Sequence, residues 1–133
     1  MKNDFLCPHC RSFLNINEDV ILLIKKPQWE GGLIMFSPEL GNYTFKNHSS
    51  FRIDEGEHFE FLCPVCHLSL TSNIDENLAG VIMRDENHEE SQILFSRAKG
   101  EQSTYQILKD HSVRTYGDHA QKYLNFVNLS MNK

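Results

Sequence analysis

Long apolar runs are missing from this chain of 133 residues. The longest run, Val20–Ile24, has the length of a strand, whereas a membrane-spanning helix needs about 20 apolar residues. The first residues include Lys2 and Asp4 and contain no apolar stretch of the kind that forms a secretory signal. We therefore expect no membrane partner and a location in the cytoplasm.

Basic residues are also scarce, because 13 Lys and Arg stand against 18 Asp and Glu and give a net charge of −5. Proteins that hold nucleic acid through its phosphates need a basic face. Basic pairs such as Lys25-Lys26 are isolated in this sequence. The charge balance disfavours nucleic acid as a partner and favours another protein.

Cysteine is limited to four residues, which form two Cys-x-x-Cys pairs, Cys7 with Cys10 and Cys63 with Cys66. A domain of this length buries about two-thirds of its unfolded surface, so it needs no disulfide scaffold. Paired cysteines without a secretion signal are typical of metal binding in a reducing compartment. The sequence therefore favours metal over disulfides.

The two pairs lie in two nearly identical six-residue segments, Phe5-Leu6-Cys7-Pro8-His9-Cys10 and Phe61-Leu62-Cys63-Pro64-Val65-Cys66. An Asn-Ile segment follows each copy, and this duplication is the only internal repeat that we find in the sequence. Each pair offers two thiolates to one ion, and two pairs complete a tetrahedral sulfur site. We therefore predict a closed structural site with one Zn²⁺ per chain, held by Cys7, Cys10, Cys63 and Cys66.

These two turns resemble the metal knuckles of zinc-ribbon and rubredoxin-like proteins, over about Phe5–Leu14 and Phe61–Leu70. The resemblance implies a metal held by the four cysteines between two β-hairpins. Many such knuckles carry glycine after the second cysteine, where this chain has Arg11 and His67. The whole-chain pattern also resembles small bacterial zinc-binding proteins with no assigned function, which implies no activity.

Other chemistries use the same cysteines. Iron in a rubredoxin-like site would make the protein an electron carrier, although the 52 residues between Cys10 and Cys63 have no role in that task. A dithiol oxidant matches Cys7-Pro8-His9-Cys10, but its first cysteine needs a following helix, and Arg11–Asp19 shows no helical periodicity. A nucleic-acid-binding zinc ribbon is a third alternative.

The remaining sequence predicts a mainly β protein, because short segments rich in β-branched and aromatic residues alternate with Gly, Pro, Asn and Asp turns. We expect an antiparallel sheet, a small barrel or a sandwich. Gln92–Arg97 and Thr104–Leu108 form the clearest hairpin. The other expected strands are Val20–Lys26, Leu33–Phe36, Tyr43–Phe45, Phe51–Ile53, Phe59–Leu62 and Val81–Arg84.

Only the C-terminal tail predicts a helix, with Asp118 as its N-cap and an apolar stripe that includes Tyr123, Leu124 and Val127. About ten residues do not form a stable helix alone, so this helix must dock on the sheet. No linker or low-complexity tract divides the chain. We therefore expect residues 1–133 to form a single β-rich zinc-binding domain.

Three further features are chemically suggestive. The stretch Asp85–Glu90 concentrates carboxylates, and a solvated hairpin tip accounts for them best. Trp29 is the single tryptophan and suits either the core or an interface. The seven histidines show no metal-ligand spacing, although His9 and His67 flank the predicted site.

No nucleophile motif or phosphate-binding loop is present, and four thiolates leave no open position for catalysis on a metal. We therefore expect a non-enzymatic zinc protein that binds another macromolecule, with protein favoured over nucleic acid.

Overall fold

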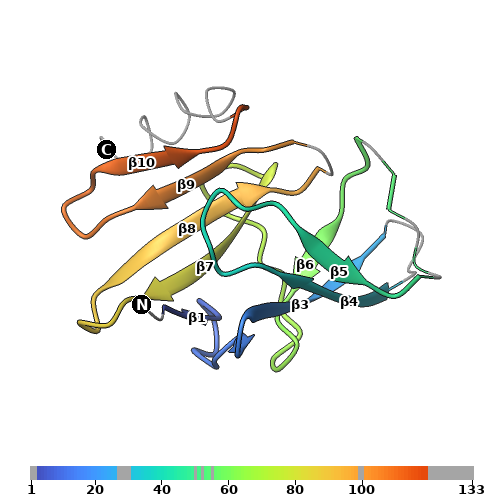
Figure 1. Ribbon diagram of the computed structural model, residues 1–133, viewed down its shortest axis with the longest axis horizontal. Helices are drawn as coiled ribbons and strands as arrows, with labels where there is room; N and C mark the ends of the chain where they lie inside the picture. Colours follow the sequence, from blue (N-terminus) through green and yellow to red (C-terminus); the bar gives the residue numbers. More distant parts are fainter. Residues whose placement is uncertain are drawn as a thin grey trace.

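The computed structural model describes residues 3–26, 31–49, 51, 53–54, 56–98 and 101–119, and these residues form ten strands in two antiparallel sheets (Figure 1). Sheet A has the order β1 (Asp4–Leu6), β7 (Leu78–Arg84), β8 (Glu90–Ser96), β9 (Thr104–Ile107) and β10 (Val113–Tyr116). Sheet B has the order β2 (Asn15–Ile16), β3 (Asp19–Lys25), β4 (Gly31–Phe36) and β5 (Phe45–Asn47), and β6 (Glu60–Leu62) also pairs with β3. The mainly β prediction is confirmed, as two open sheets.

The long strands form because buried apolar residues recur at every second position, which places them on one face of a sheet. In β3 the buried residues are Val20, Leu22 and Ile24. In β7 they include Val81 and Met83. These faces meet in the main core cluster between the two sheets. A second cluster lies on the other face of sheet A and contains Leu78, Leu94, Tyr105 and Ile107.

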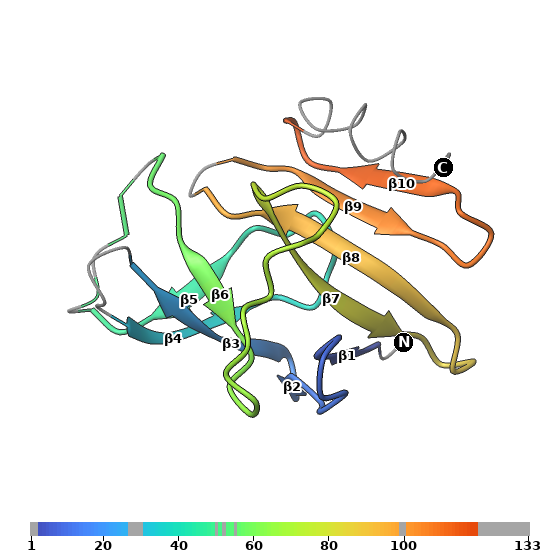
Figure 2. The same cartoon turned by 180° about the vertical axis from the view of Figure 1, so that it is seen from behind.

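Each cysteine knuckle belongs to a hairpin that joins both sheets. The first hairpin enters through β1, which pairs with β7 in sheet A, and leaves through β2, which pairs with β3 in sheet B. The second enters through β6, which pairs with β3, and its return limb meets β7 through the bridge Thr71↔Ala79 (Figure 2). The knuckles therefore lie at the junction of the sheets.

The two halves of the chain share one topology as far as β5 and β9 and exchange their first strands, whereas β10 has no counterpart in sheet B among the described residues. Strand β1 precedes β3 in the chain but pairs with β7, whereas β6 precedes β7 but pairs with β3. The registers are equivalent, because Phe5 lies opposite Met83 and Phe61 lies opposite Ile24. An approximate two-fold axis therefore relates the halves.

The repeat continues beyond the knuckles, so the duplicated knuckles are not, as the sequence had indicated, the only internal repeat. Lys25↔Gly31 closes the β3–β4 hairpin as Arg84↔Glu90 closes β7–β8. In the next hairpin, Phe36↔Phe45 corresponds to Phe95↔Thr104. Strand positions need only an apolar or polar character. Different residues therefore fill equivalent positions, and this conceals the repeat.

The expected strands differ from the observed ones in several places. The β8–β9 hairpin is confirmed, whereas the described residues Phe51 and Ile53 lie outside any strand. Strands β1, β2 and β10 were not predicted. The expected C-terminal helix beyond His119, and Trp29, lie outside the described residues. Within the described part of the chain, no helix has the length and apolar character that crossing a membrane requires.

The loop after β10 depends on glycine at position 117. Gly117 has φ +95°, and a β-carbon there would overlap the Gln102 carbonyl oxygen and the Tyr43 hydroxyl. Gly56 has φ +77°, but a β-carbon would meet nothing within 4 Å. Both positions are strained for any L-residue, and only Gly117 is also crowded.

We predict that Gly117→Ala lowers the free energy of unfolding by about 3 kcal/mol, because backbone strain and overlap add. The matched control Gly56→Ala should lower it by about 1 kcal/mol, from strain alone. Urea unfolding followed by circular dichroism measures both. Equal effects of the two substitutions would contradict the crowded environment of Gly117.

Candidate metal centre

The structure brings together the four cysteines that the sequence singled out. Cys7 and Cys10 follow β1, and Cys63 and Cys66 follow β6. Each half of the pseudo-symmetric chain therefore supplies one pair of cysteines to the junction. The two knuckle loops lie side by side at the bottom of the molecule in Figure 1. All four sulfur atoms lie within 4.8 Å of one another.

The distances between the sulfur atoms fit a tetrahedron. Cys7 Sγ lies 3.8 Å from Cys66 Sγ, and Cys10 Sγ lies 3.7 Å from Cys63 Sγ. A regular tetrahedron with metal–sulfur bonds of about 2.3 Å places its sulfurs about 3.8 Å apart. A disulfide would need about 2.05 Å, and all four cysteines are free. The donor set therefore fits a metal of the zinc or iron type.

Both knuckles direct backbone N–H groups at the first cysteine of the pair. The His9 N–H donates to Cys7 Sγ at 3.3 Å, and the Val65 N–H donates to Cys63 Sγ at 3.3 Å. The N–H of the second cysteine in each pair adds a longer bond, at 3.5 and 3.4 Å. Such bonds stabilise thiolate charge and orient the sulfur toward a metal.

The turn geometry after each second cysteine is the left-handed one that glycine favours. Arg11 has φ 61° and His67 has φ 66°, and their N–H groups donate to the carbonyls of Cys7 and Cys63, each at 2.9 Å. The absence of glycine therefore leaves the knuckle turn intact. It costs backbone strain at two equivalent positions.

The electrostatics of the cluster favour a cation. Cys7 and Cys63 are fully buried. Burial raises the pKa of the Cys7 thiol to about 12, whereas the Ser12 side chain, by hydrogen bonding, lowers the pKa of the exposed Cys10 thiol to about 6. Thiolate is the metal-binding form, and a cation at the centre offsets the cost of burying its charge.

Polar contacts outside the cluster hold the knuckles in place. A ring nitrogen of His9 lies 2.9 Å from the Ser69 carbonyl oxygen, and this contact joins the first knuckle to the second hairpin rather than to a thiolate. The Arg11 guanidinium bonds to Glu90, which also accepts a bond from Arg84 at 3.1 Å. Hydrogen bonds from Arg11 and Arg84 lower the pKa of the Glu90 carboxyl.

The acidic stretch contributes no ligand to the cysteine cluster. Asp85–Glu90 spans the β7–β8 turn, and its residues 86–89 are exposed, as expected for a hairpin tip. Among the described histidines, cysteines and carboxylates, the four cysteines form the one group close enough to hold a metal ion. The structure also gives the dithiol alternative no helix after Cys7, because residues 8–10 form a turn.

Sequence reasoning missed two features, an apolar outer face on sheet B and a cavity between the sheets. The sequence did contain a signal for the apolar outer face. Val20–Ile24 is apolar at every position, and alternate residues of a strand point to opposite faces. Both faces of β3 are therefore apolar. The cavity has no comparable signal, because it depends on how loops from the two halves meet.

No protein family, curated protein or solved structure matches this chain.

We predict that His67→Gly leaves the protein more stable than His67→Ala, by about 1 kcal/mol, because both remove the exposed side chain and only glycine accepts a positive φ without strain. Urea unfolding with metal present measures the difference. An alanine variant as stable as the glycine variant would contradict the left-handed turn.

We predict that Cys63→Ser releases the metal and lowers the free energy of unfolding by about 3 kcal/mol or more, because metal binding is linked to folding. Metal content after dialysis and thermal melting are the measurements. The control Val65→Ser changes an exposed residue between the two ligands and should keep both properties. Unchanged melting of Cys63→Ser would refute a structural role for the metal.

Proposed function

We propose that this protein is a non-enzymatic, cytoplasmic zinc protein that binds another protein. One Zn²⁺, held by Cys7, Cys10, Cys63 and Cys66, would fix the junction of the two sheets. The outer face of sheet B would then form the binding surface. The main observation in support of protein binding is a row of leucines on that face.

The row crosses three strands at one register position. Leu23 in β3 lies opposite Leu33 in β4 and opposite Leu62 in β6. Residues that lie directly opposite in antiparallel strands share a face. Since the neighbours of Leu23 in β3 are buried in the core, this row points outward. Leu33 is 56% exposed.

Further apolar residues extend the row into a surface. Ile21 and Met35 lie opposite each other on the same face, two residues along their strands. Ile16, opposite Asp19, adds a side chain that is 64% exposed. We call these six residues the leucine face: Ile16, Ile21, Leu23, Leu33, Met35 and Leu62. Ile16 and Leu33 are exposed and the other four are half-buried, and a contiguous solvent-accessible apolar surface of this kind is typical of an interaction site.

The placement of charge supports a protein partner over nucleic acid. Arg11 and Arg84 both bind Glu90, and Lys46 lies 3.4 Å from Asp19 at the margin of the leucine face. Arginines and lysines neutralised in this way offer little to phosphates. An apolar centre with charges at its margin is the usual anatomy of a protein interface.

Burial of the first sulfur of each pair supports a structural metal over redox chemistry. Cys7 and Cys63 have no exposed surface, although Cys10 is exposed, and a dithiol oxidant uses the first cysteine of its pair as the accessible attacking sulfur. Four thiolates close the coordination sphere, which is typical of structural zinc. Iron would fit the same tetrahedron, and the red colour of a ferric Cys₄ site distinguishes it from colourless zinc.

We predict that Leu33→Glu weakens the capture of the protein partner at least about tenfold, because it places a charge in the apolar centre of the face. The control Gln92→Glu adds the same charge at the pseudo-equivalent exposed position in β8 and should capture as well as the wild type. The measurement is an affinity pull-down from native lysate, with and without nuclease.

A stoichiometric protein that survives nuclease and is lost only with Leu33→Glu would support the proposal. Equal capture by both variants would refute the leucine face as the binding surface. Recovery of nucleic acid alone, removed by nuclease, would favour the nucleic-acid-binding alternative.

A further inference from the structure

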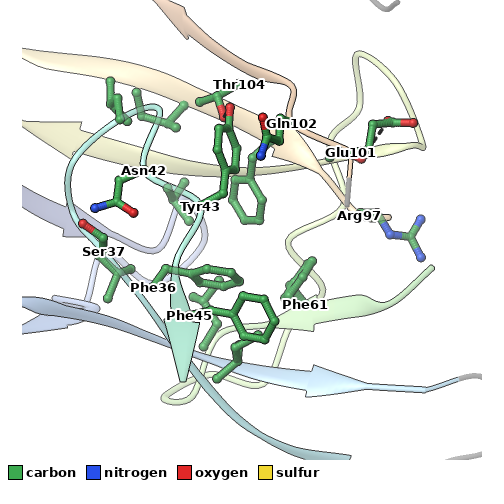
Figure 3. Close-up of a pocket in the computed structure, with 18 of the residues that line it drawn as sticks. Phe36, Ser37, Asn42, Tyr43, Phe45, Phe61, Arg97, Glu101, Gln102 and Thr104 are labelled. Atoms are coloured by element: carbon green, nitrogen blue, oxygen red, sulfur yellow. Dashed lines mark hydrogen bonds between the residues drawn. The ribbon is translucent and has the colours of Figure 1, made fainter. Parts of the chain in front are cut away.

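The main core contains a partly enclosed cavity of about 300 Å³ between the two sheets (Figure 3). Folded interiors are close-packed, and voids larger than a few water molecules are unusual in them. The volume reaches the lower end of the range for small-molecule sites, about 300–1,000 Å³. The cavity is separate from the leucine face, which lies on the opposite side of sheet B.

One wall of the cavity is apolar and rich in aromatic rings, of which Phe61 is buried and the others are half-buried. Phe36 packs against Phe61 and Phe95, with ring centroids 5.8 and 6.0 Å apart, and Phe45 lies 6.4 Å from Phe36. Figure 3 shows Phe36, Phe45 and Phe61 gathered on one side of the cavity. A stable water molecule needs two or more polar partners, which this wall does not supply.

The mouth of the cavity is built by two equivalent loops of the repeat. The loop after β4 and the loop after β8 both supply lining residues. At the start of each loop a serine hydroxyl accepts a bond from the N–H two residues later: Ser37, which follows β4, from Glu39 at 3.2 Å, and Ser96, the last residue of β8, from Ala98 at 3.1 Å. The approximate two-fold axis therefore runs through the entrance, and both halves contribute to one site.

Polar groups at the mouth favour a ligand with a positive end. Glu39, which is exposed, and Glu101 both line the cavity, and the Glu101 carboxylate accepts a bond from the Ser96 hydroxyl at 2.8 Å. Arg97 also lines the cavity, but its Nε and Nη1 donate to the carbonyls of Phe59 and Glu76, at 2.8 and 2.6 Å. The Tyr43 hydroxyl already bonds to the Tyr116 carbonyl oxygen, at 3.1 Å.

From this arrangement we propose that the cavity binds a small apolar amine, whose hydrocarbon part enters between the phenylalanines and whose ammonium stays at the mouth near Glu39. The site is distinct from the metal centre. The metal supports it indirectly, because the cysteine knuckles join the two sheets that form its walls.

Three probes of equal length test the class of ligand: octylamine, octanol and octanoate. Calorimetric titration of the zinc-loaded full chain should give saturable binding of octylamine at one site, about tenfold tighter than octanoate, with octanol between them. Tightest binding of octanoate, or no saturable binding of octylamine, would overturn the proposal.

Two variants locate the charge effect. Glu39→Gln should remove most of the preference for octylamine over octanol, because it removes one carboxylate from the mouth. The control Glu18→Gln removes an equally exposed carboxylate that does not line the cavity, and should leave the preference unchanged. An equal loss in both variants would mean that net charge alone attracts the amine, and would overturn the proposal.

A filling variant and its control locate the apolar part. Leu40 lines the cavity from the loop after β4 and packs against the core. Leu40→Trp should weaken octylamine binding at least about tenfold by occupying the space, whereas Leu40→Met conserves volume and should bind normally. Metal content and thermal melting show whether each variant is folded.

Methyl-group nuclear magnetic resonance keeps the proposal testable if Leu40→Trp does not fold. In the wild-type protein, octylamine should shift the methyl signals of Ile34 and Ile93, which line the cavity, and leave that of Leu33 on the leucine face unchanged. Shifts confined to Leu33 and its neighbours would place the amine on the outer face and overturn the proposal.

Discussion

The junction at which two short hairpins bring four cysteine sulfurs within 4.8 Å is the constraint on which the rest of the structure depends. Each hairpin pairs with both sheets, so the position of one sheet relative to the other is set where the knuckles meet. The strands that enter the knuckles, β1 and β6, have only three residues each, and such short strands form few hydrogen bonds. A structural metal bound by the four cysteines would contribute on the order of 10 kcal/mol to folding, far more than these strands.

Exchange of the first strands makes the two halves one unit. Because β1 completes the sheet of the second half and β6 that of the first, neither half forms its sheet alone. The same pseudo-symmetry places equivalent residues, Phe36 and Phe95, in contact across the core. The two proposed binding sites lie apart, because the leucine face is on the outer side of sheet B and the aromatic cavity is on its inner side. Both depend on the same junction.

Local patterns predicted what depends on local physics, and contacts distant in the chain account for what they missed. The Cys-Pro-x-Cys phrases predicted which sulfurs would meet, and Gln92–Arg97 with Thr104–Leu108 predicted a hairpin that forms with the expected partners. Strand β1 was missed because three residues carry too little alternation, and its partner β7 lies far along the chain. The repeat was hidden because Leu33 and Gln92 occupy equivalent positions with unlike side chains. The cavity depends on two loops meeting across the axis, which no pattern within either loop encodes.

X-ray absorption at the metal edge, on protein purified without added metal, tests the central claim most directly. The proposal predicts one zinc per chain, surrounded by four sulfur atoms at about 2.3 Å with no nitrogen or oxygen ligand. Such a spectrum would establish that both knuckles bind the same ion and that its coordination is closed. Protein that folds fully without metal, or a metal coordinated by only two sulfurs, would contradict it. The sheet junction would then be held by packing alone, and the cysteines would need another role.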